Sequence, residues 1–287
     1  WIADASLKVD EWYDPTLTLI YLPHLDYALQ KFGIDFDKIS PSLNEIDALC
    51  KQVITYYEGK GAEVLLLSEY GITSVNQPVH INRALRKAGY IQVKDELGLE
   101  TLDAGTCGAF AVADHQLAHV YVKEAEEIPK VKDLLSGLPG VEKVLDKQAQ
   151  EAYQLNHDRS GDLVVVADKN SWFTYYYWLD DKVAPDYART VDIHRKPGYD
   201  PVEMFANPDI KFLKGKLGWT LLKKKLGFRY LMDVIPLKAE LVKGSHGRIP
   251  EDQADWPVLI GAKQAKEKEG VAPTDVYSII HGLVNRK

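Results

Sequence analysis

Carboxylates and imidazoles occur in three short stretches that follow apolar runs or lie in glycine-rich loops. LTLIYLPHLDYALQ carries His24 and Asp26, LLLSEYGIT carries Glu69 and Tyr70, and KGSHGRIP carries His246. Carboxylate oxygens and imidazole nitrogens are the usual protein ligands of zinc, manganese and similar divalent ions. The three stretches therefore indicate a metal site with His24, Asp26, Glu69 and His246 as candidate ligands. Taken singly, each is also explained by a strand end or by local hydrogen bonds.

Two further stretches carry candidates for substrate binding. In DIHRKPGYDP, His194 and Arg195 precede a Pro-Gly turn, and this arrangement suits an anionic substrate group, although a charged surface loop explains it equally well. In ADHQLAHVYV, His115 and His119 are four residues apart, which is a ligand spacing on a helix. That stretch is typical of half strand and half turn, so we expect substrate contact or plain hydrogen bonding there instead of metal binding.

The elements that must position these residues begin with an alternation of strand and helix. Apolar, β-branched and aromatic runs predict strands at 17–22 and 63–68, and helical periodicity predicts helices at 42–61, capped by Ser42, and at 80–90. Strands that are apolar throughout and alternate with helices are typical of a parallel sheet covered on both faces. We therefore expect an α/β fold with a mainly parallel sheet and helices on both faces.

Shorter elements with closer turns follow, and they indicate a smaller inserted α/β block. WFTYYYWLDD within it predicts a packed edge strand, with a pocket-lining face as the alternative. We expect 1–95 to form a core part, 96–200 a cap-like insertion, and 201–287 a return to the core that ends in a helix. The remaining predicted elements are strands at 109–114, 119–124, 141–145, 162–168 and 256–261, and helices at 128–138 and 273–287.

Composition excludes several classes of protein. The chain is 46% hydrophobic and 27% charged, which is typical of a globular protein, and its net charge of −7 argues against nucleic-acid binding. The longest apolar runs have only strand length, so we expect no membrane association. No signal peptide is visible, and two cysteines suit a reducing compartment, so we expect a cytoplasmic protein. The basic run at 223–225 reads as a solvated helix face. A start at Trp1 instead of Met indicates part of a longer protein.

The order of these segments resembles the alkaline phosphatase superfamily. A strand ending in Asp before a helix, a strand ending in Ser-acid-X-Gly and a late Gly-Ser-His-Gly are similar to its type I phosphodiesterase/nucleotide pyrophosphatase branch, which includes phosphonoacetate hydrolase. The resemblance covers 17–287, with the middle block matching the cap-like insertion only loosely. It implies an alkaline phosphatase-like fold and metal-dependent hydrolysis of phosphate esters, phosphodiesters or pyrophosphates. In that family two metal ions share ligands from Asp-x-x-x-His, Ser-Asp-His-Gly and a late His.

This sequence departs from the family pattern at two imidazole positions. Asp26 matches the first Asp and His246 the late His, but Gln30 stands where the pattern has His, and Glu69-Tyr70 replaces Asp-His. A phenol has a pKa near 10 and is a rare ligand for these ions. The segment that bears the family's nucleophile is absent, so we expect the chain alone to be inactive.

His24 is the nearest replacement for a lost imidazole, because two residues that are two apart in a strand point to the same face. With Asp26, Glu69 and His246 it supplies donors for about one four-coordinate ion. We therefore expect at most one tightly bound divalent ion, most plausibly zinc or manganese.

Two hypotheses of function stay open. The first is a metal-dependent hydrolase of phosphorylated small molecules, with a nucleophile from a missing N-terminal segment. The second is a catalytically degenerate member that binds a phosphorylated small molecule or a protein partner. Loss of two imidazole positions favours the second, whereas retention of Asp26 and of the Gly-Ser-His-Gly loop favours the first. The sequence does not indicate the oligomeric state or the substrate.

Overall fold

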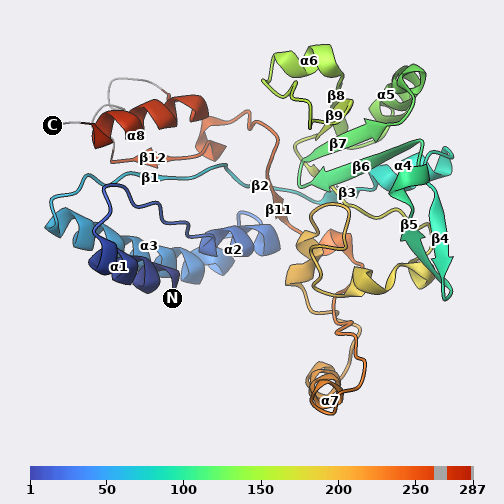
Figure 1. Cartoon of the computed structure of the whole chain (residues 1–287), viewed down its shortest axis with the longest axis horizontal. Coiled ribbons are helices and arrows are strands. Elements are labelled where there is room, and N and C mark those ends of the chain that lie inside the picture. Colours follow the sequence, from blue (N-terminus) through green and yellow to red (C-terminus); the bar gives the residue numbers. More distant parts are fainter. Residues whose placement is uncertain (262–269, 286–287) are drawn as a thin grey trace. The chain divides into compact units, whose positions relative to one another are not determined.

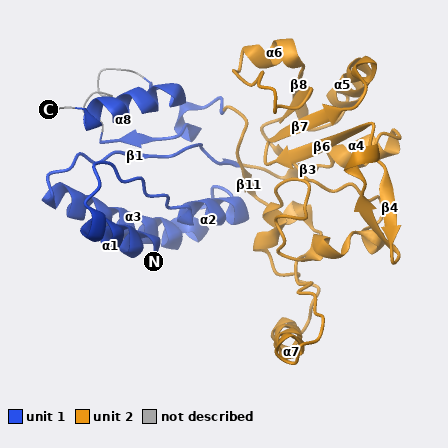
Figure 2. Ribbon diagram, viewed as in Figure 1, with its two compact units in different colours: residues 1–73, 250–287 blue, residues 74–249 orange. Residues whose placement is uncertain are grey.

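The chain folds into two compact units. The computed structural model describes residues 1–261 and 270–285. Unit 1 comprises residues 1–73 and 250–287, and unit 2 comprises residues 74–249 (Figure 2). Unit 1 is thus built from two separated stretches of sequence, whereas unit 2 is continuous. Whether 96–200 is an insertion in the family's sense stays a prediction.

Unit 1 consists mainly of helices. The buried carboxylate of Asp10 in α1 accepts hydrogen bonds from Lys60 Nζ at 2.6 Å and from the Tyr56 hydroxyl in α3 at 2.9 Å, which ties these two helices together. The strands β1 and β12 form an antiparallel pair in which Leu66 faces Ile260. The bounds are α1 Ile2–Tyr13, α2 His24–Phe32, α3 Phe36–Gly59, β1 Leu66–Leu67, β12 Leu259–Ile260 and α8 Val276–Val284.

Two sequence-based expectations for unit 1 are wrong. Residues 17–22 form no strand, since none of them is paired in a sheet. The helix expected from Ser42 begins earlier, at Phe36, because Asp35 caps it by accepting the backbone N–H of Lys38 at 3.4 Å. Pro41 then lies inside the helix, near enough to its start for the loss of one hydrogen bond to be tolerated. The expected C-terminal helix is confirmed as α8, although its last two predicted residues lie outside the described residues.

Unit 2 is organised around a four-stranded antiparallel sheet with the order β6-β7-β9-β8. Along β6 the residues Ala109, Ala111 and Ala113 are buried while their neighbours are more exposed, which is the alternation of a strand with one covered face. A two-residue turn joins β6 to β7, and such a turn can connect only antiparallel neighbours. Parallel pairing occurs in the described part of unit 2 between β3 and β10, so a mainly parallel sheet is not confirmed.

The elements of unit 2 agree with the expected strands at 109–114, 141–145 and 162–168 and with the helix at 128–138. The helix expected at 80–90 is also confirmed, with α4 ending at Lys87. The bounds are β3 Gln77–Val79, α4 Ile81–Lys87, β4 Val93–Glu96, β5 Leu99–Leu102, β6 Ala109–Asp114, β7 Leu117–Val122, α5 Ile128–Ser136, β8 Val141–Leu145, α6 Lys147–Glu151, β9 Leu163–Ala167, β10 Ser171–Phe173, α7 Leu213–Lys225 and β11 Gly244–Ser245 (Figure 1). The strand β2, Thr73–Ser74, lies where the chain passes from unit 1 to unit 2.

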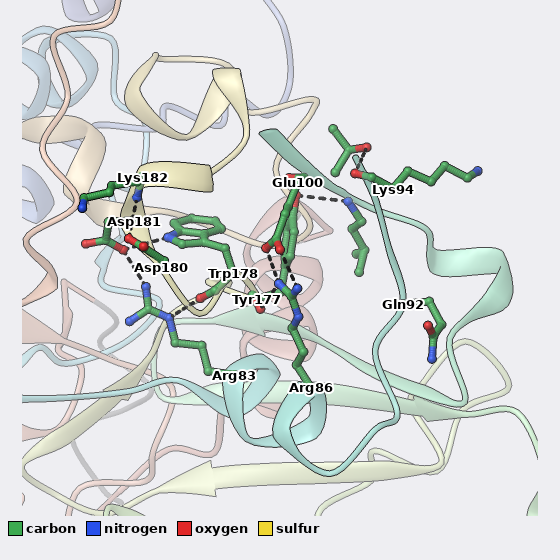
Figure 3. A network of polar contacts seen from close by, with 12 residues as sticks. Arg83, Arg86, Gln92, Lys94, Glu100, Tyr177, Trp178, Asp180, Asp181 and Lys182 are labelled. Carbon is green, nitrogen blue, oxygen red and sulfur yellow. Dashed lines mark hydrogen bonds and ion pairs between the residues drawn. The ribbon is translucent and has the colours of Figure 1, made fainter. Parts of the chain in front are cut away.

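The aromatic stretch 172–178 is core and not an edge strand. Every side chain in it is buried, and only its first residues belong to a strand, β10. Two arginines of α4 hold the remaining residues of this stretch in place (Figure 3). Arg83 Nε donates to the carbonyl of Trp178 at 2.7 Å, and Arg86 Nη1 donates to the carbonyl of Tyr177 at 3.4 Å. The same Arg86 guanidinium forms a two-pronged ion pair with Glu100. The backbone groups that a strand would have satisfied are thus partly satisfied by cationic side chains.

None of the helices in the described residues is both long enough and apolar enough to traverse a bilayer.

Candidate functional site

Asp26 of unit 1 is held by two neutral donors. It lies in the first turn of α2, where Gln30 Nε2 donates to its Oδ2 at 2.7 Å and the Tyr70 hydroxyl donates to its Oδ1 at 3.2 Å. Gln30 is fully buried and follows Asp26 by one helical turn, so the i, i+4 spacing brings the amide to the carboxylate. Burial raises the pKa of Asp26 above its ordinary value, and the two hydrogen bonds oppose this shift.

The residues at the two lost imidazole positions therefore contact the same carboxylate. An imidazole would offer a lone pair to a metal, whereas the Gln30 amide and the Tyr70 phenol each present a hydrogen to Asp26. Burial raises the pKa of Tyr70 well above its ordinary value, which keeps the phenol protonated and able to donate. This arrangement does not fit a two-metal centre of the family type.

The other two unit 1 candidates lie apart from this arrangement. His24 and Asp26 lie in a helix and not at the end of a strand. Each residue of a helix is rotated by about 100° from the one before, so two residues that are two apart point to different faces. The prediction that His24 and Asp26 point to the same face is therefore wrong. Nε2 of His24 lies 2.8 Å from a carboxylate oxygen of Glu45. Glu69 is exposed in the segment that follows β1. Their roles as ligands stay predictions.

In unit 2, the rings of His246 and His115 lie close together and are tilted by 34°. The ring centroids are 3.9 Å apart, and the ring of Tyr199 lies 4.6 Å from His115 on a tilted plane. Ser245 Oγ is 3.5 Å from His115 Nδ1. His115 and His246 were predicted separately, as a substrate contact and a metal ligand, and the structure brings them together. Their neighbours Tyr199, Ser245 and Gln116 were not predicted.

The turn between β6 and β7 explains how these side chains are brought together. His115 and Gln116 form the two-residue turn, in which His115 has φ 56°, a left-handed conformation that usually requires glycine. The backbone N–H of Gln116 donates to the carbonyl of His246 at 2.8 Å, and the His115 carbonyl accepts from the N–H of Phe173 at 2.7 Å. These bonds lock the turn against the loop that carries His246.

The Pro-Gly turn of DIHRKPGYDP supplies the third ring. Gly198 has φ 128°, and a Cβ there would come within 2.6 Å of the Ala113 carbonyl oxygen, so only glycine allows this close approach. The next residue, Tyr199, donates its backbone N–H to that same carbonyl at 2.9 Å, at the end of β6. The Pro-Gly pair in the sequence predicted the turn that positions Tyr199, but it did not show what that turn packs against.

Burial controls the charge of these two imidazoles. Burial, and secondarily the adjacent His246, lowers the pKa of His115 to about 3, and burial lowers the pKa of His246 to about 4. Both rings are therefore neutral at pH 7. Neutral imidazoles can accept a proton, accept a hydrogen bond or donate a lone pair to a metal ion.

The remaining substrate candidates have other partners. Arg195 is exposed and forms a two-pronged ion pair with Asp186 at 2.8 and 3.3 Å, with its guanidinium 4.8 Å from the ring of Tyr187. His194 is exposed beside it. His119 lies on β7, where its Nδ1 accepts the backbone N–H of Gly161 at 3.1 Å. Substrate binding by His115, His119, His194 and Arg195 stays a prediction.

Within the described ranges, no cluster of three or more His, Cys, Asp or Glu side chains is close enough to hold a metal ion. Asp26 and Glu69 belong to unit 1 and His246 to unit 2, and each unit by itself lacks a full ligand set.

The comparison with protein families decides the relationship. The family model for type I phosphodiesterase / nucleotide pyrophosphatase matches residues 1–200. The chain belongs to that family. The resemblance to the alkaline phosphatase superfamily is thereby confirmed, and the expected fold is confirmed as a mixture of helices and strands.

Two solved structures are similar to the chain to different degrees. Murine ectonucleotide pyrophosphatase / phosphodiesterase 5, an inactive form in complex with AMP, is 15% identical, with a TM-score of 0.56, and the match covers 100% of this chain and 60% of that one. Phosphonoacetate hydrolase from Sinorhizobium meliloti 1021, in complex with phosphonoacetate, is 18% identical with a TM-score of 0.44, and the match covers 60% of this chain and 41% of that one. The chain therefore spans about half the length of the solved structures it matches.

Proposed function

We propose that the protein hydrolyses a phosphate ester, phosphodiester or pyrophosphate bond of a small molecule. The observation that supports this proposal is the family match across residues 1–200. The neighbouring imidazoles of His115 and His246 add a second argument, because neutral rings beside Tyr199 and Ser245 offer hydrogen-bond partners for a phosphoryl group.

We further propose that the protein holds at most one divalent ion, zinc or manganese, with Asp26 and His246 as ligands and Glu69 and His24 as secondary candidates. A bound ion would polarise the phosphoryl oxygens of the substrate. Gln30 and Tyr70 argue against a second ion, because both donate hydrogen bonds to Asp26 where the family pattern has imidazoles.

The test uses the whole protein, including the N-terminal segment expected to supply the nucleophile, and measures turnover and metal content on the same preparations. A chromogenic phosphodiester and a phosphate monoester are assayed with added Zn²⁺ or Mn²⁺, and the metal is quantified before and after mild chelation. Asp26→Asn and His246→Ala are each expected to lower activity by about 10–100-fold. His157→Ala is the matched control, since His157 is an exposed imidazole of unit 2 outside the candidate residues. Two ions per chain would contradict the one-ion proposal.

A second candidate function is supported by the same hydrogen bonds on Asp26. A carboxylate satisfied by an amide and a phenol can be a structural group, and the protein would then bind a phosphorylated small molecule without hydrolysing it. In that case no substrate of either class is turned over, while calorimetry with a nucleoside monophosphate shows binding that His246→Ala weakens. Turnover that requires Asp26 and His246 would exclude this candidate.

A further inference from the structure

The segment between Asp209 and Asp233 is strongly basic in a chain that is acidic overall. It contains seven Lys or Arg residues and no Asp or Glu, whereas the net charge of the whole chain is −7. The segment includes α7 and its flanking loops, and Figure 1 shows α7 standing away from the sheet of unit 2. We call residues 210–232 the basic arm.

Apolar side chains of the basic arm are exposed together with these cations. Trp219, Leu222 and Leu226 are spaced three and four residues apart, so they share one face of α7, and all three are exposed. Phe212 and Phe228, at the two ends of the helix, are 78% and 64% exposed. An exposed apolar stripe of this kind is unusual on a soluble surface and marks an interaction site.

Most of the cations of the basic arm form no ion pair with the residues of unit 2 that the structure describes. Lys216 pairs with Asp233 at 2.8 Å, whereas the triplet Lys223, Lys224 and Lys225 forms no ion pair with any residue that the structure describes. Lys223 and Lys224 lie instead beside aromatic rings, 5.7 Å from the centroids of Trp219 and Tyr230. Long lysine side chains that border an apolar face can keep their ammonium groups at a polar boundary while the stems contact hydrocarbon.

We propose that the basic arm is a docking surface for a lipid bilayer that carries anionic headgroups. The lysines match the charge of the headgroups, and Trp219, Leu222 and Leu226 match the hydrocarbon just beneath them. With 13 residues, α7 is about 20 Å long, too short to cross a bilayer, so it would lie along the surface. The expectation of no membrane association rested on the absence of a spanning segment, which this arrangement does not need. Exposed leucines argue against nucleic acid as the occupant.

This inference is independent of the proposed hydrolysis, because the basic arm contains none of the candidate site residues. The test is flotation of the protein with vesicles of phosphatidylcholine alone and of phosphatidylcholine mixed with phosphatidylglycerol. We expect binding to the mixed vesicles only, and loss of most binding between 0.1 M and 1 M salt, as the Debye length falls from about 10 to about 3 Å.

Variants then assign the binding to the basic arm. The triple change Lys223→Gln, Lys224→Gln and Lys225→Gln is expected to weaken vesicle binding about 100-fold, and Trp219→Ala about tenfold. The matched control replaces three exposed lysines of unit 2 elsewhere, Lys123, Lys169 and Lys182, by Gln and is expected to leave binding unchanged.

Several results would overturn the proposal. They are no binding to anionic vesicles, equal binding to neutral vesicles, or equal losses in the α7 triple and the control triple. Sedimentation velocity without lipid examines the other occupant, a second copy of the chain. Self-association abolished by Trp219→Ala, with vesicle binding unaffected, would assign the face to a protein interface and contradict our inference. Circular dichroism of each variant checks folding, and the salt and lipid dependence of the unaltered protein decides the question without any variant.

Discussion

Two stretches of unit 2 are rich in aromatic residues and cations, and they have opposite environments. In 171–178 every side chain is buried, and the nearby cations Arg83 and Lys196 are paired with carboxylates. In the basic arm the aromatic rings are exposed and the lysine triplet forms no ion pair with the described residues. Aromatic content therefore does not predict burial. The distribution of acidic residues is the better guide, because a cation can enter a core only with a counter-charge.

The largest expected effect comes from truncating one tryptophan in each stretch. Trp178 is 0% exposed and Trp219 is 59% exposed. Trp178→Ala should lower the free energy of unfolding by about 3–5 kcal/mol, since it leaves a cavity and removes the indole N–H bond to Asp181. Trp219→Ala should change it by no more than about 0.5 kcal/mol. Urea unfolding midpoints measure both, and equal losses would mean that α7 is packed against something within the chain.

A comparable but slightly smaller effect is expected from the buried cation Lys196. Its ammonium group lies 2.8 Å from Asp200 and 2.6 Å from Glu203, and its side chain is 1% exposed. Lys196→Met should cost about 3 kcal/mol, because it leaves the buried Asp200 and the half-buried Glu203 without their cation, and protonation of these carboxylates can lower the cost. Lys238→Met, which breaks the exposed pair with Asp209, should cost about 0–1 kcal/mol. Similar losses for the two variants would contradict the distinction between buried and exposed pairs.

The smallest effect concerns how a paired carboxylate responds to acid. A hydrogen bond from Lys60 is the main cause that lowers the pKa of Asp10 below 3.8, and burial opposes it. A lowered folded pKa gives stability that is present above pH 3.8 and is lost as the pH falls through the folded value. Asp10→Asn should therefore flatten the acid limb of stability against pH, followed by urea midpoints from pH 7 to below pH 3.8.

The Lys223, Lys224 and Lys225 triple change is the control for this titration. Because these lysines form no ion pair with described carboxylates, replacing them by Gln should leave the acid limb unchanged. A flatter limb in the triple variant would show that an acidic partner had been overlooked, and the comparison between paired and unpaired cations would fail.

The sequence pattern of a short stretch predicted a strand correctly where that stretch also found a partner in the sheet. AFAVAD alternates between covered and less covered residues and forms β6 at the expected residues, and VEKVL forms β8. LTLIYL has the same strand-like composition but forms no strand, and Leu19 and Tyr21 are exposed. A strand needs a partner as well as propensity, and a single sequence does not show where a partner will be.

The sequence indicated which residues could belong to a site, but it did not show which of them contact one another. His115 and His246 were each recognised, yet the contact between their rings depends on a turn and a loop 130 residues apart. The loss of two imidazoles was visible in the sequence, whereas the contact of both replacements with Asp26 was not. Part of it could have been found, because Asp26 and Gln30 have helical i, i+4 spacing once 24–32 is read as a helix.

The discontinuity of unit 1 sets an order of events during synthesis. Unit 2 is continuous, and near its ends the N–H of Val75 donates to the carbonyl of Lys243 at 2.9 Å, so it can close on itself as soon as residue 249 has left the ribosome. Unit 1 must wait, because β1 pairs with β12, and Leu66 finds Ile260 only after the whole of unit 2 has been made. The first helices thus spend that interval without their sheet pairing. Chains truncated at residue 249 and released from the ribosome should accordingly carry a protease-resistant unit 2 behind a protease-sensitive N-terminal segment.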